Sequence, residues 1–242
     1  MHLQARCVPA GDTCLIMEFG GEINPELHYR VRSLMLALEA HPVPGIVELV
    51  PAYCSLTVHY DPLLTTFRQI TGQIKIVAET LGAHNLPAAR LIDIPVVYGG
   101  DYGPDLEFVA GQRGMSTEEV IARHTSGDYL VYMLGFIPGF PYLGGLDERI
   151  AVPRLAKPRA HIPAGSVGIA GKQTGIYPLD SPGGWRLIGR TPLVLFDAAT
   201  AEPVLLRPGD HLRFRAVSPA EYEEIRRQVR DGTYSLAVTP RA

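Results

Sequence analysis

Three arginines in the second half of the chain have the chemistry to hold an anion. Arg159, Arg186 and Arg190 each lie close to a Gly or Pro, so we place them on turns. A guanidinium on a turn can pair with both oxygens of a carboxylate or a phosphate. Any one of them could equally be solvated, but their shared setting in Gly- and Pro-rich segments favours a binding role. We therefore expect an anion-binding site in this region.

Uncharged polar side chains occupy the same region. Gln173, Thr174 and Tyr177 offer hydrogen-bond donors and acceptors without charge, which suits an amide or a carboxylate ligand. Ser166, a few residues earlier, joins them as a candidate binding residue.

His124 is the candidate for proton transfer. Ser116 and Glu119 form a capping-box pattern, which predicts a helix that ends near His124 and Gly127. In the last turn of a helix the dipole favours the charged imidazolium. His124 could therefore act as an acid, a base or an anion donor, or it could equally do no more than cap helix carbonyls.

Aromatic side chains are concentrated between positions 136 and 145, FIPGFPYLGG. The two prolines break the alternation of a regular strand, so Phe136, Phe140 and Tyr142 cannot all face a barrel interior. We expect part of this surface to be exposed, with Phe140 and Tyr142 lining a site or a partner contact. Trp185, the only Trp, belongs to the same surface or else fills the core.

One segment imitates a phosphate-binding loop without meeting its requirements. In GSVGIAGKQT (165–174) the spacing between the first Gly and Gly-Lys is one residue too long, and Gln173 occupies the place of the Ser or Thr hydroxyl. Gly175 and Pro178 also leave no room for the helix that would follow. We interpret Lys172 as a solvated turn residue.

Composition narrows the class of protein. The 242 residues carry a net charge of −3 without a basic run, which disfavours nucleic acid as a partner. No segment is long and apolar enough to span a membrane, and the N-terminus lacks a signal-peptide core. Three cysteines without metal-type spacing indicate reduced thiols and a cytoplasmic location, and we expect no metal site.

The first 88 residues predict a small α+β domain of order β-α-β-β-α. A strand over 13–19 precedes a helix that starts at Asn24-Pro25 and ends at His41-Pro42. Strands over 45–50 and 53–60 follow. A second helix is expected to open at Asp61-Pro62 and to end at Gly82, with both helices on one face of the sheet.

Residues 89–242 predict a second, mainly β domain, because Gly and Pro divide it into short strands and tight turns. Its first strand, 90–98, is expected at a sheet edge because it contains Pro95. Short helices are predicted near 105–114 and after Ser116. Strand character resumes over 204–217 around a Pro208-Gly209-Asp210 turn, a helix begins at Ser218-Pro219, and TYSLAVTP ends the chain as a possible strand.

The motif block itself resembles a known family. HTSGDYLVYMLGFIPGFPYLGGL, KPRAHIPAGSVGIAGKQTGIYPLDSPGGWRLIGRTPL and RPGD are similar to the allophanate hydrolase subunit 1 family over nearly the whole chain. Members include one component of prokaryotic ATP-dependent 5-oxoprolinase and the sporulation kinase inhibitor KipI. The resemblance implies an N-terminal α/β domain and a cyclophilin-like barrel. It also implies a homologous barrel subunit and a third subunit as partners, and ATP with Mg²⁺ shared among them.

The resemblance also gives the candidate residues roles. For ATP-driven hydrolysis of the 5-oxoproline lactam to glutamate, Arg159, Arg186 and Arg190 would clamp phosphate or the substrate carboxylate. Gln173 and Tyr177 would orient the amide, and His124 would move a proton. Because the partner half is missing from this chain, we expect it to be inactive alone.

Three alternatives remain open beside a component of 5-oxoprolinase. A KipI-type protein would bind a histidine kinase and catalyse nothing. A urea- or allophanate-processing carboxyltransferase and a prolyl isomerase are further alternatives, and the barrel fold alone does not establish the latter.

Overall fold

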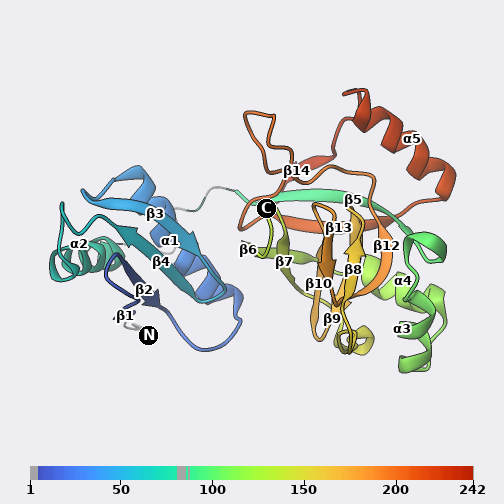
Figure 1. Cartoon of the computed structure of the whole chain (residues 1–242), viewed down its shortest axis with the longest axis horizontal. Coiled ribbons are helices and arrows are strands. Elements are labelled where there is room, and N and C mark those ends of the chain that lie inside the picture. The colour runs from blue at the N-terminus through green and yellow to red at the C-terminus, as the bar shows by residue number, and fades with distance from the viewer. Residues whose placement is uncertain (1–4, 81–85, 87, 242) are drawn as a thin grey trace. The chain divides into compact units, whose positions relative to one another are not determined.

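The computed structural model describes residues 5–80, 86 and 88–241, which divide after position 87 into two compact units (Figure 1). We call them the N-terminal unit and the barrel unit. That each folds as an independent domain, with boundaries at 1–88 and 89–242, stays a prediction.

The N-terminal unit is a four-stranded antiparallel sheet of order β1-β2-β4-β3 with two helices. Its elements are β1 Arg6–Pro9, β2 Cys14–Glu18, α1 Pro25–Ala40, β3 Ile46–Pro51, β4 Ser55–Tyr60 and α2 Phe67–Thr80. Leu15 and Met17 of β2, alternating along the strand, pack with α1 and α2 in one apolar core. Both helices therefore share one sheet face, as predicted, while β1 was not predicted.

The start of α1 follows the sequence signal. The Asn24 side chain accepts a hydrogen bond from the Glu26 N–H at 2.7 Å, and Pro25 occupies the first turn. Val31, Leu34 and Leu38 lie on its buried face.

The predicted start of α2 is wrong. Asp61 forms a turn, in which its carboxylate accepts from the Leu63 N–H at 2.9 Å and its carbonyl from the Thr65 N–H at 3.1 Å. The helix begins six residues later, where Thr66 and Gln69 hydrogen-bond to each other's backbone N–H groups. The predicted end at Gly82 lies outside the described residues.

The barrel unit contains a closed sheet. Its order is β12-β9-β10-β7-β6-β13-β5, and β5 also pairs with β12, so these seven strands form a ring (Figure 1). The strands are β5 Arg90–Tyr98, β6 Tyr129–Leu134, β7 Pro141–Gly144, β9 Ser166–Ala170, β10 Gln173–Ile176, β12 Arg186–Arg190 and β13 His211–Ala216. A small separate sheet joins β8 Arg159–Ile162 to β11 Ser181–Gly183.

Helices and short turns complete this unit. They are η1 Gly100–Tyr102, α3 Leu106–Arg113, α4 Thr117–Thr125, η2 Glu148–Ile150 and α5 Pro219–Arg230, followed by strand β14 Val238–Pro240. Both halves of the Ser116–Glu119 capping box are present at the start of α4. The turn predicted at Pro208-Gly209-Asp210 is present and β13 follows it, whereas before the turn Val204 forms an isolated bridge to Phe196.

The prediction that β5 lies at an edge is wrong. One side of β5 pairs in parallel with β13, and its other side pairs with β14 at residues 90–92 and with β12 at residues 97–98. Pro95 falls between these last two stretches, where the ladder requires no N–H group. The missing donor therefore costs nothing there.

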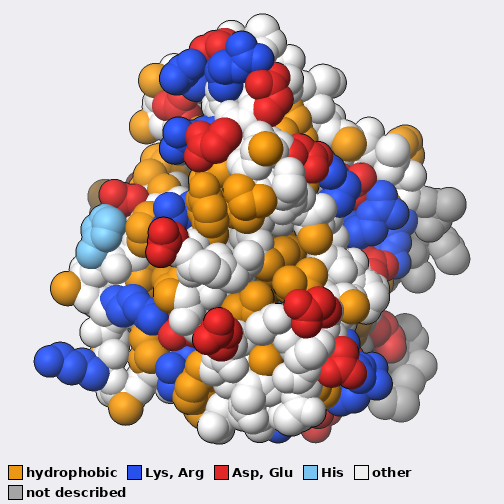
Figure 2. Space-filling view, turned by 90° about the vertical axis from the view of Figure 1, so that its right-hand side faces the viewer, with side chains coloured by type: hydrophobic (Ala, Val, Ile, Leu, Met, Phe, Trp, Pro, Cys, Tyr) orange, Lys and Arg blue, Asp and Glu red, His pale blue; other side chains and the backbone are white. Residues whose placement is uncertain are grey.

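On the face seen in Figure 2, acidic and basic side chains alternate with apolar ones. On α5 they form the ion pairs Arg226–Glu223 and Arg227–Glu224. This face therefore carries no continuous basic stripe of the kind that follows a phosphate backbone. No helix in the described part of the chain is long and apolar enough to cross a membrane.

Candidate functional site

The barrel unit carries a pocket of about 310 Å³ on its outer side. Such a volume suits a small ligand, being at the low end of ligand sites in proteins. The lining is largely aromatic, with prolines, glycines and one arginine: Phe136, Phe140, Tyr142, Arg154, Leu155, Pro158, Tyr177, Pro182, Gly183, Gly184 and Trp185.

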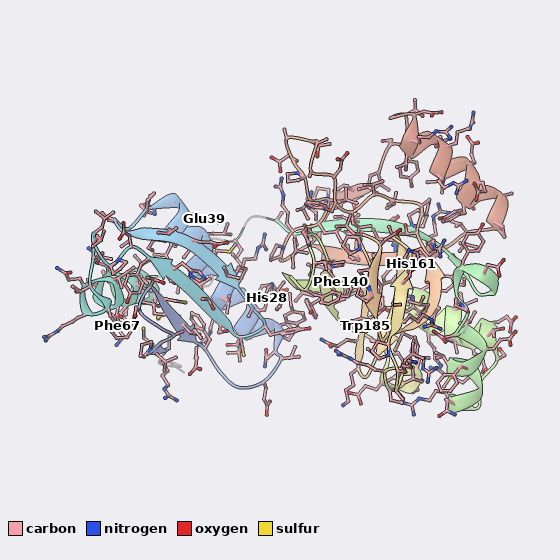
Figure 3. The ribbon with its side chains drawn as sticks, viewed as in Figure 1. His28, Glu39, Phe67, Phe140, His161 and Trp185 are labelled. Atoms are coloured by element: carbon pink, nitrogen blue, oxygen red, sulfur yellow. The ribbon has the colours of Figure 1, made fainter. Side chains whose placement is uncertain are left out.

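Phe140 is the centre of the aromatic lining. Its ring makes edge-to-face contacts with Tyr142, Tyr177 and Trp185 at centroid distances of 5.2–5.4 Å. Phe140 and Trp185 are nearly buried, at 2% and 5% exposure, and Figure 3 places them side by side in the barrel unit. The structure therefore brings four aromatic residues from three predicted segments into one cluster.

Phe136 is the exposed member of the run. It lies at φ 65°, in the left-handed region, and its side chain is 61% exposed. A bulky residue in this conformation carries strain of about 1–3 kcal/mol. The prediction that some of this aromatic surface is exposed is confirmed at Phe136, whereas Phe140 forms the floor of the pocket.

Glycines leave room for these rings. A Cβ at Gly175 would come within 3.0 Å of both Phe140 and Trp185, and one at Gly183 would come within 2.4 Å of the Tyr177 hydroxyl. A Cβ at Gly184 would meet no atom closer than 3.7 Å. One wall of the pocket is therefore bare backbone.

Tyr177 supplies the phenol at the pocket. Burial raises its pKa, while a hydrogen bond from the Trp185 backbone and the charges of Arg154 and Arg159 oppose that effect. The phenol therefore stays protonated near neutral pH and keeps its O–H as a donor.

Arg154 brings a positive charge to the pocket. Its guanidinium lies 5.9 Å from the centre of the Trp185 ring, and no carboxylate of the described residues lies within ion-pair distance of it. Sequence reasoning missed Arg154, although it follows Pro153 and so carries the signal that singled out Arg159.

Arg159 and Arg186 meet on one buried carboxylate. Both terminal nitrogens of Arg159 lie 2.9 Å from Asp105 oxygens, and Arg186 lies 3.8 Å from the same carboxylate while stacking on Phe108 at 3.6 Å. Asp105 also accepts from the Leu187 N–H at 2.7 Å. Asp105 was not predicted as a site residue, although it begins the segment 105–114 in which a short helix was expected.

The turn placement of the arginines is wrong. Arg159 begins β8, and Arg186 and Arg190 are the first and last residues of β12. Arg190 lies away from Asp105, with its guanidinium 5.9 Å from the Tyr102 ring.

His124 lies in the core of the barrel unit, outside the pocket lining. Tyr98 hydrogen-bonds to its Nδ1 at 2.8 Å, and its Nε2 lies 3.0 Å from the Thr174 hydroxyl, which donates to the Gly168 carbonyl. These bonds are all satisfied by a neutral ring that carries its proton on Nε2. Burial lowers the His124 pKa to about 3, so the expectation of a charged imidazolium is wrong.

The remaining candidates lie around the β9–β10 hairpin. Lys172 is in its turn and pairs with Glu148 at 2.7 Å, Gln173 begins β10, and Ser166 begins β9 fully buried. No helix follows this hairpin, so the interpretation that it is not a phosphate-binding loop is confirmed. The catalytic and binding roles predicted for the site residues stay predictions.

Burial of His124 predicts a loss of barrel stability in mild acid. The unfolded imidazole, with a pKa near 6.5, takes up a proton that the folded ring refuses until about pH 3. The contribution of His124 to the free energy of unfolding is therefore complete above pH 6.5. It declines below that pH by about 1.4 kcal/mol per pH unit. Urea unfolding between pH 6.5 and 4.5, followed by Trp185 fluorescence, measures this above the range where most carboxylates titrate.

His124→Gln is the matched variant, since an amide can accept from Tyr98 and donate to Thr174. Its stability should change less over the same pH range. Equal slopes for both proteins would contradict the assignment of the effect to His124.

A closed β-barrel with flanking helices is also the architecture of urea-processing carboxyltransferases. The Kluyveromyces lactis urea amidolyase superposes with a TM-score of 0.79 over 97% of this chain and 16% of its own, at 24% identity, which shows the fold alone. TTHA0988 superposes with a TM-score of 0.77 at 39% identity, over 85% of this chain and 40% of that protein. The chain thus spans less than half the length of these solved structures.

The chain belongs to the family described as carboxyltransferase domain, subdomain C and D, which matches residues 5–206. It is 46% identical to the B subunit of 5-oxoprolinase from Bacillus subtilis (strain 168), over 88% of this chain and 92% of that protein. The corresponding protein of Escherichia coli O157:H7 is 45% identical over 87% and 95%. The resemblance inferred from the motif block is confirmed by these matches.

Proposed function

We propose that this protein is the B subunit of an ATP-dependent 5-oxoprolinase and that its aromatic pocket holds the lactam substrate. The observation that carries this proposal is the pocket itself. Its small volume is lined by five aromatic rings, and Arg154 lies beside them with no described carboxylate within ion-pair distance. The similarity to the same component of known 5-oxoprolinases over nearly the whole chain supports this assignment.

The lining matches the chemistry of 5-oxoproline. The substrate is a five-membered ring bearing an amide and a carboxylate, so it needs an apolar wall, a hydrogen-bond partner and a cation. Phe140 and Trp185 would pack on the ring, the Tyr177 O–H would donate to the lactam oxygen, and Arg154 would pair with the carboxylate. Asp105 would hold Arg159 close to the Tyr177 phenol.

Hydrolysis breaks the lactam C–N bond and adds water across it, giving glutamate. An amide is a poor electrophile, and ATP can activate it by phosphorylating the lactam oxygen, which creates a leaving group. A protonated Tyr177 would stabilise charge that develops on that oxygen.

The described residues contain neither a phosphate-binding loop nor a metal cluster for ATP and Mg²⁺. The hairpin over 165–174 offers no helix N-terminus to a triphosphate, and no three His, Cys, Asp or Glu of the described residues are arranged to hold a metal ion. In this proposal ATP and Mg²⁺ are shared among the subunits of the assembled enzyme. The partners in this proposal are a homologous barrel subunit and a third subunit.

Reconstitution tests the proposal. The purified chain should release little or no glutamate from 5-oxoproline and ATP, and the mixture with both partner subunits should be active. Robust activity of the single chain would refute its role as a dependent subunit, and an inactive complete mixture would refute the proposed reaction.

Gly184→Ala sharpens the test at the pocket. The added methyl group meets no atom closer than 3.7 Å, so folding should be unaffected while the pocket loses space. The variant enzyme should therefore show a raised KM for 5-oxoproline with an unchanged melting temperature. Glu148→Gln, which removes the exposed partner of Lys172, serves as the control outside the pocket.

A further inference from the structure

Arg190 is a partly buried arginine of the barrel unit whose guanidinium has no ion pair among the described residues. Its Nε is buried and has no hydrogen-bond partner, and no ion pair joins its guanidinium to any described carboxylate. Arg154 also lacks an ion pair there, but it is exposed and water solvates it. Arg190 is only partly exposed, so its charge is partly withdrawn from water without an ion pair among the described residues.

The surroundings of Arg190 come from three elements. In the β12–β9 ladder Arg190 pairs with Ser166, so the two side chains lie on the same face of the sheet. Tyr102 of η1 and Tyr222 of α5 pack against each other at 4.9 Å, and the Arg190 guanidinium lies near Tyr102. Burial raises the pKa of Tyr222, and the nearby charge of Arg190 opposes this.

Hydrogen bonds from the Ala164 N–H and from His161 lower the pKa of Asp180, and the charge of Arg190 adds to this effect, but Asp180 and Arg190 form no ion pair. Asp180 accepts from the Ala164 N–H at 2.7 Å and contacts His161 at 3.2 Å. Glu223 pairs with Arg226 at 2.6 Å. Ser166 is fully buried, and its hydroxyl has no partner among the described residues. The site thus combines a guanidinium that has no described ion pair with a buried hydroxyl that is also unsatisfied.

We propose that Arg190 binds a phosphate-type oxyanion beside Tyr102 of η1 and Tyr222 of α5, which do not line the aromatic pocket. Its terminal nitrogens are the part of the side chain that reaches solvent, and their fork matches two oxygens of a phosphoryl group. Choosing phosphate over carboxylate rests on the proposed function, which releases phosphate and ADP. Free phosphate and the phosphates of a nucleotide share this chemistry.

The test is a titration of the full chain at constant ionic strength with inorganic phosphate, ADP and adenosine, followed by calorimetry. Phosphate and ADP should bind, and adenosine should not. Arg190→Gln should weaken phosphate binding at least tenfold, because a charged hydrogen-bonded pair is lost. The phosphate affinity of Arg190→Lys should lie between those of the wild type and Arg190→Gln, since Lys keeps the charge but loses the guanidinium fork.

Affinity for ADP equal to that for phosphate would identify the phosphoryl group alone as the ligand, and tighter binding of ADP would identify a nucleotide. Lys172→Gln removes one positive charge from the β9–β10 turn and should leave phosphate binding unchanged. Unaltered binding by Arg190→Gln, or none by the wild type at millimolar phosphate, would overturn the proposal.

Melting temperature separates binding from a structural role. Because Arg190 has no ion pair among the described residues, Arg190→Gln should melt at or above the wild-type temperature in phosphate-free buffer. A clear drop would show that Arg190 holds the fold together. Because phosphate binding is measured on the single chain, it can succeed when reconstituted oxoprolinase activity fails, and the reverse.

Discussion

Phe140→Ala should lower the free energy of unfolding of the barrel unit by about 3–5 kcal/mol. The ring is almost fully buried and contacts Tyr142, Tyr177 and Trp185, and its removal leaves a cavity beneath the pocket. Gly175, whose missing Cβ leaves space for this ring, cannot refill it. Chemical denaturation followed by Trp185 fluorescence measures the loss.

Phe136→Ala is the matched control. It removes the same ring from the same loop at an exposed position, so its cost should stay within about 1 kcal/mol. In the assembled enzyme Phe140→Ala should also raise the KM for 5-oxoproline. Similar losses of stability for the two variants would contradict the placement of Phe140 as the floor of the pocket.

Asp105→Asn should also lower the free energy of unfolding of the barrel unit by roughly 3–5 kcal/mol, because two guanidiniums lose the carboxylate between them. Asp105 is buried, Arg159 contacts both of its oxygens, and Arg186 lies 3.8 Å away. The asparagine can still accept from the Leu187 N–H, so the loss reports on the charges. Thermal and urea unfolding check it.

Asp180→Asn provides the comparison, since Asp180 is an exposed carboxylate of the same unit whose partner is His161. Exposed pairs contribute about 1 kcal/mol or less. If Asp105→Asn cost no more than Asp180→Asn, the cluster around Asp105 would have no structural importance.

The features that could be predicted from the sequence are those set by residues a few positions apart. Helix α1 and helix α4 begin at side-chain caps within three residues of the groups they satisfy, so their starts can be read from the chain. The start of α2 was predicted wrongly because two helix-start signals lie close together. Asp61-Pro62 forms a turn, and Thr66 caps the helix.

What could not be predicted depends on the closed sheet. A proline in a strand suggests an edge position. In the closed sheet, β14 and β12 pair with β5 on either side of Pro95 in sequence, so no ladder hydrogen bond is lost at Pro95. The charge of His124 was misjudged for the same reason, since helix position is local whereas burial is not. Part of the aromatic lining was found because Phe136, Phe140 and Tyr142 are close together in sequence, whereas the fold brings Tyr177 and Trp185 to them.

The same closure makes β5 dependent on strands that are synthesised much later than β5 itself. Its ladder partners are β12, β13 and β14, the first of which begins at Arg186. About 90 residues separate β5 from β12, so at roughly 5–20 residues per second the strand waits on the order of 5–20 s on the ribosome. During that interval its apolar sequence, LIDIPVVY, is an unpaired edge open to other chains. Pro95, which costs no hydrogen bond in the finished barrel, lacks the N–H group that an added strand would need at the middle of that edge.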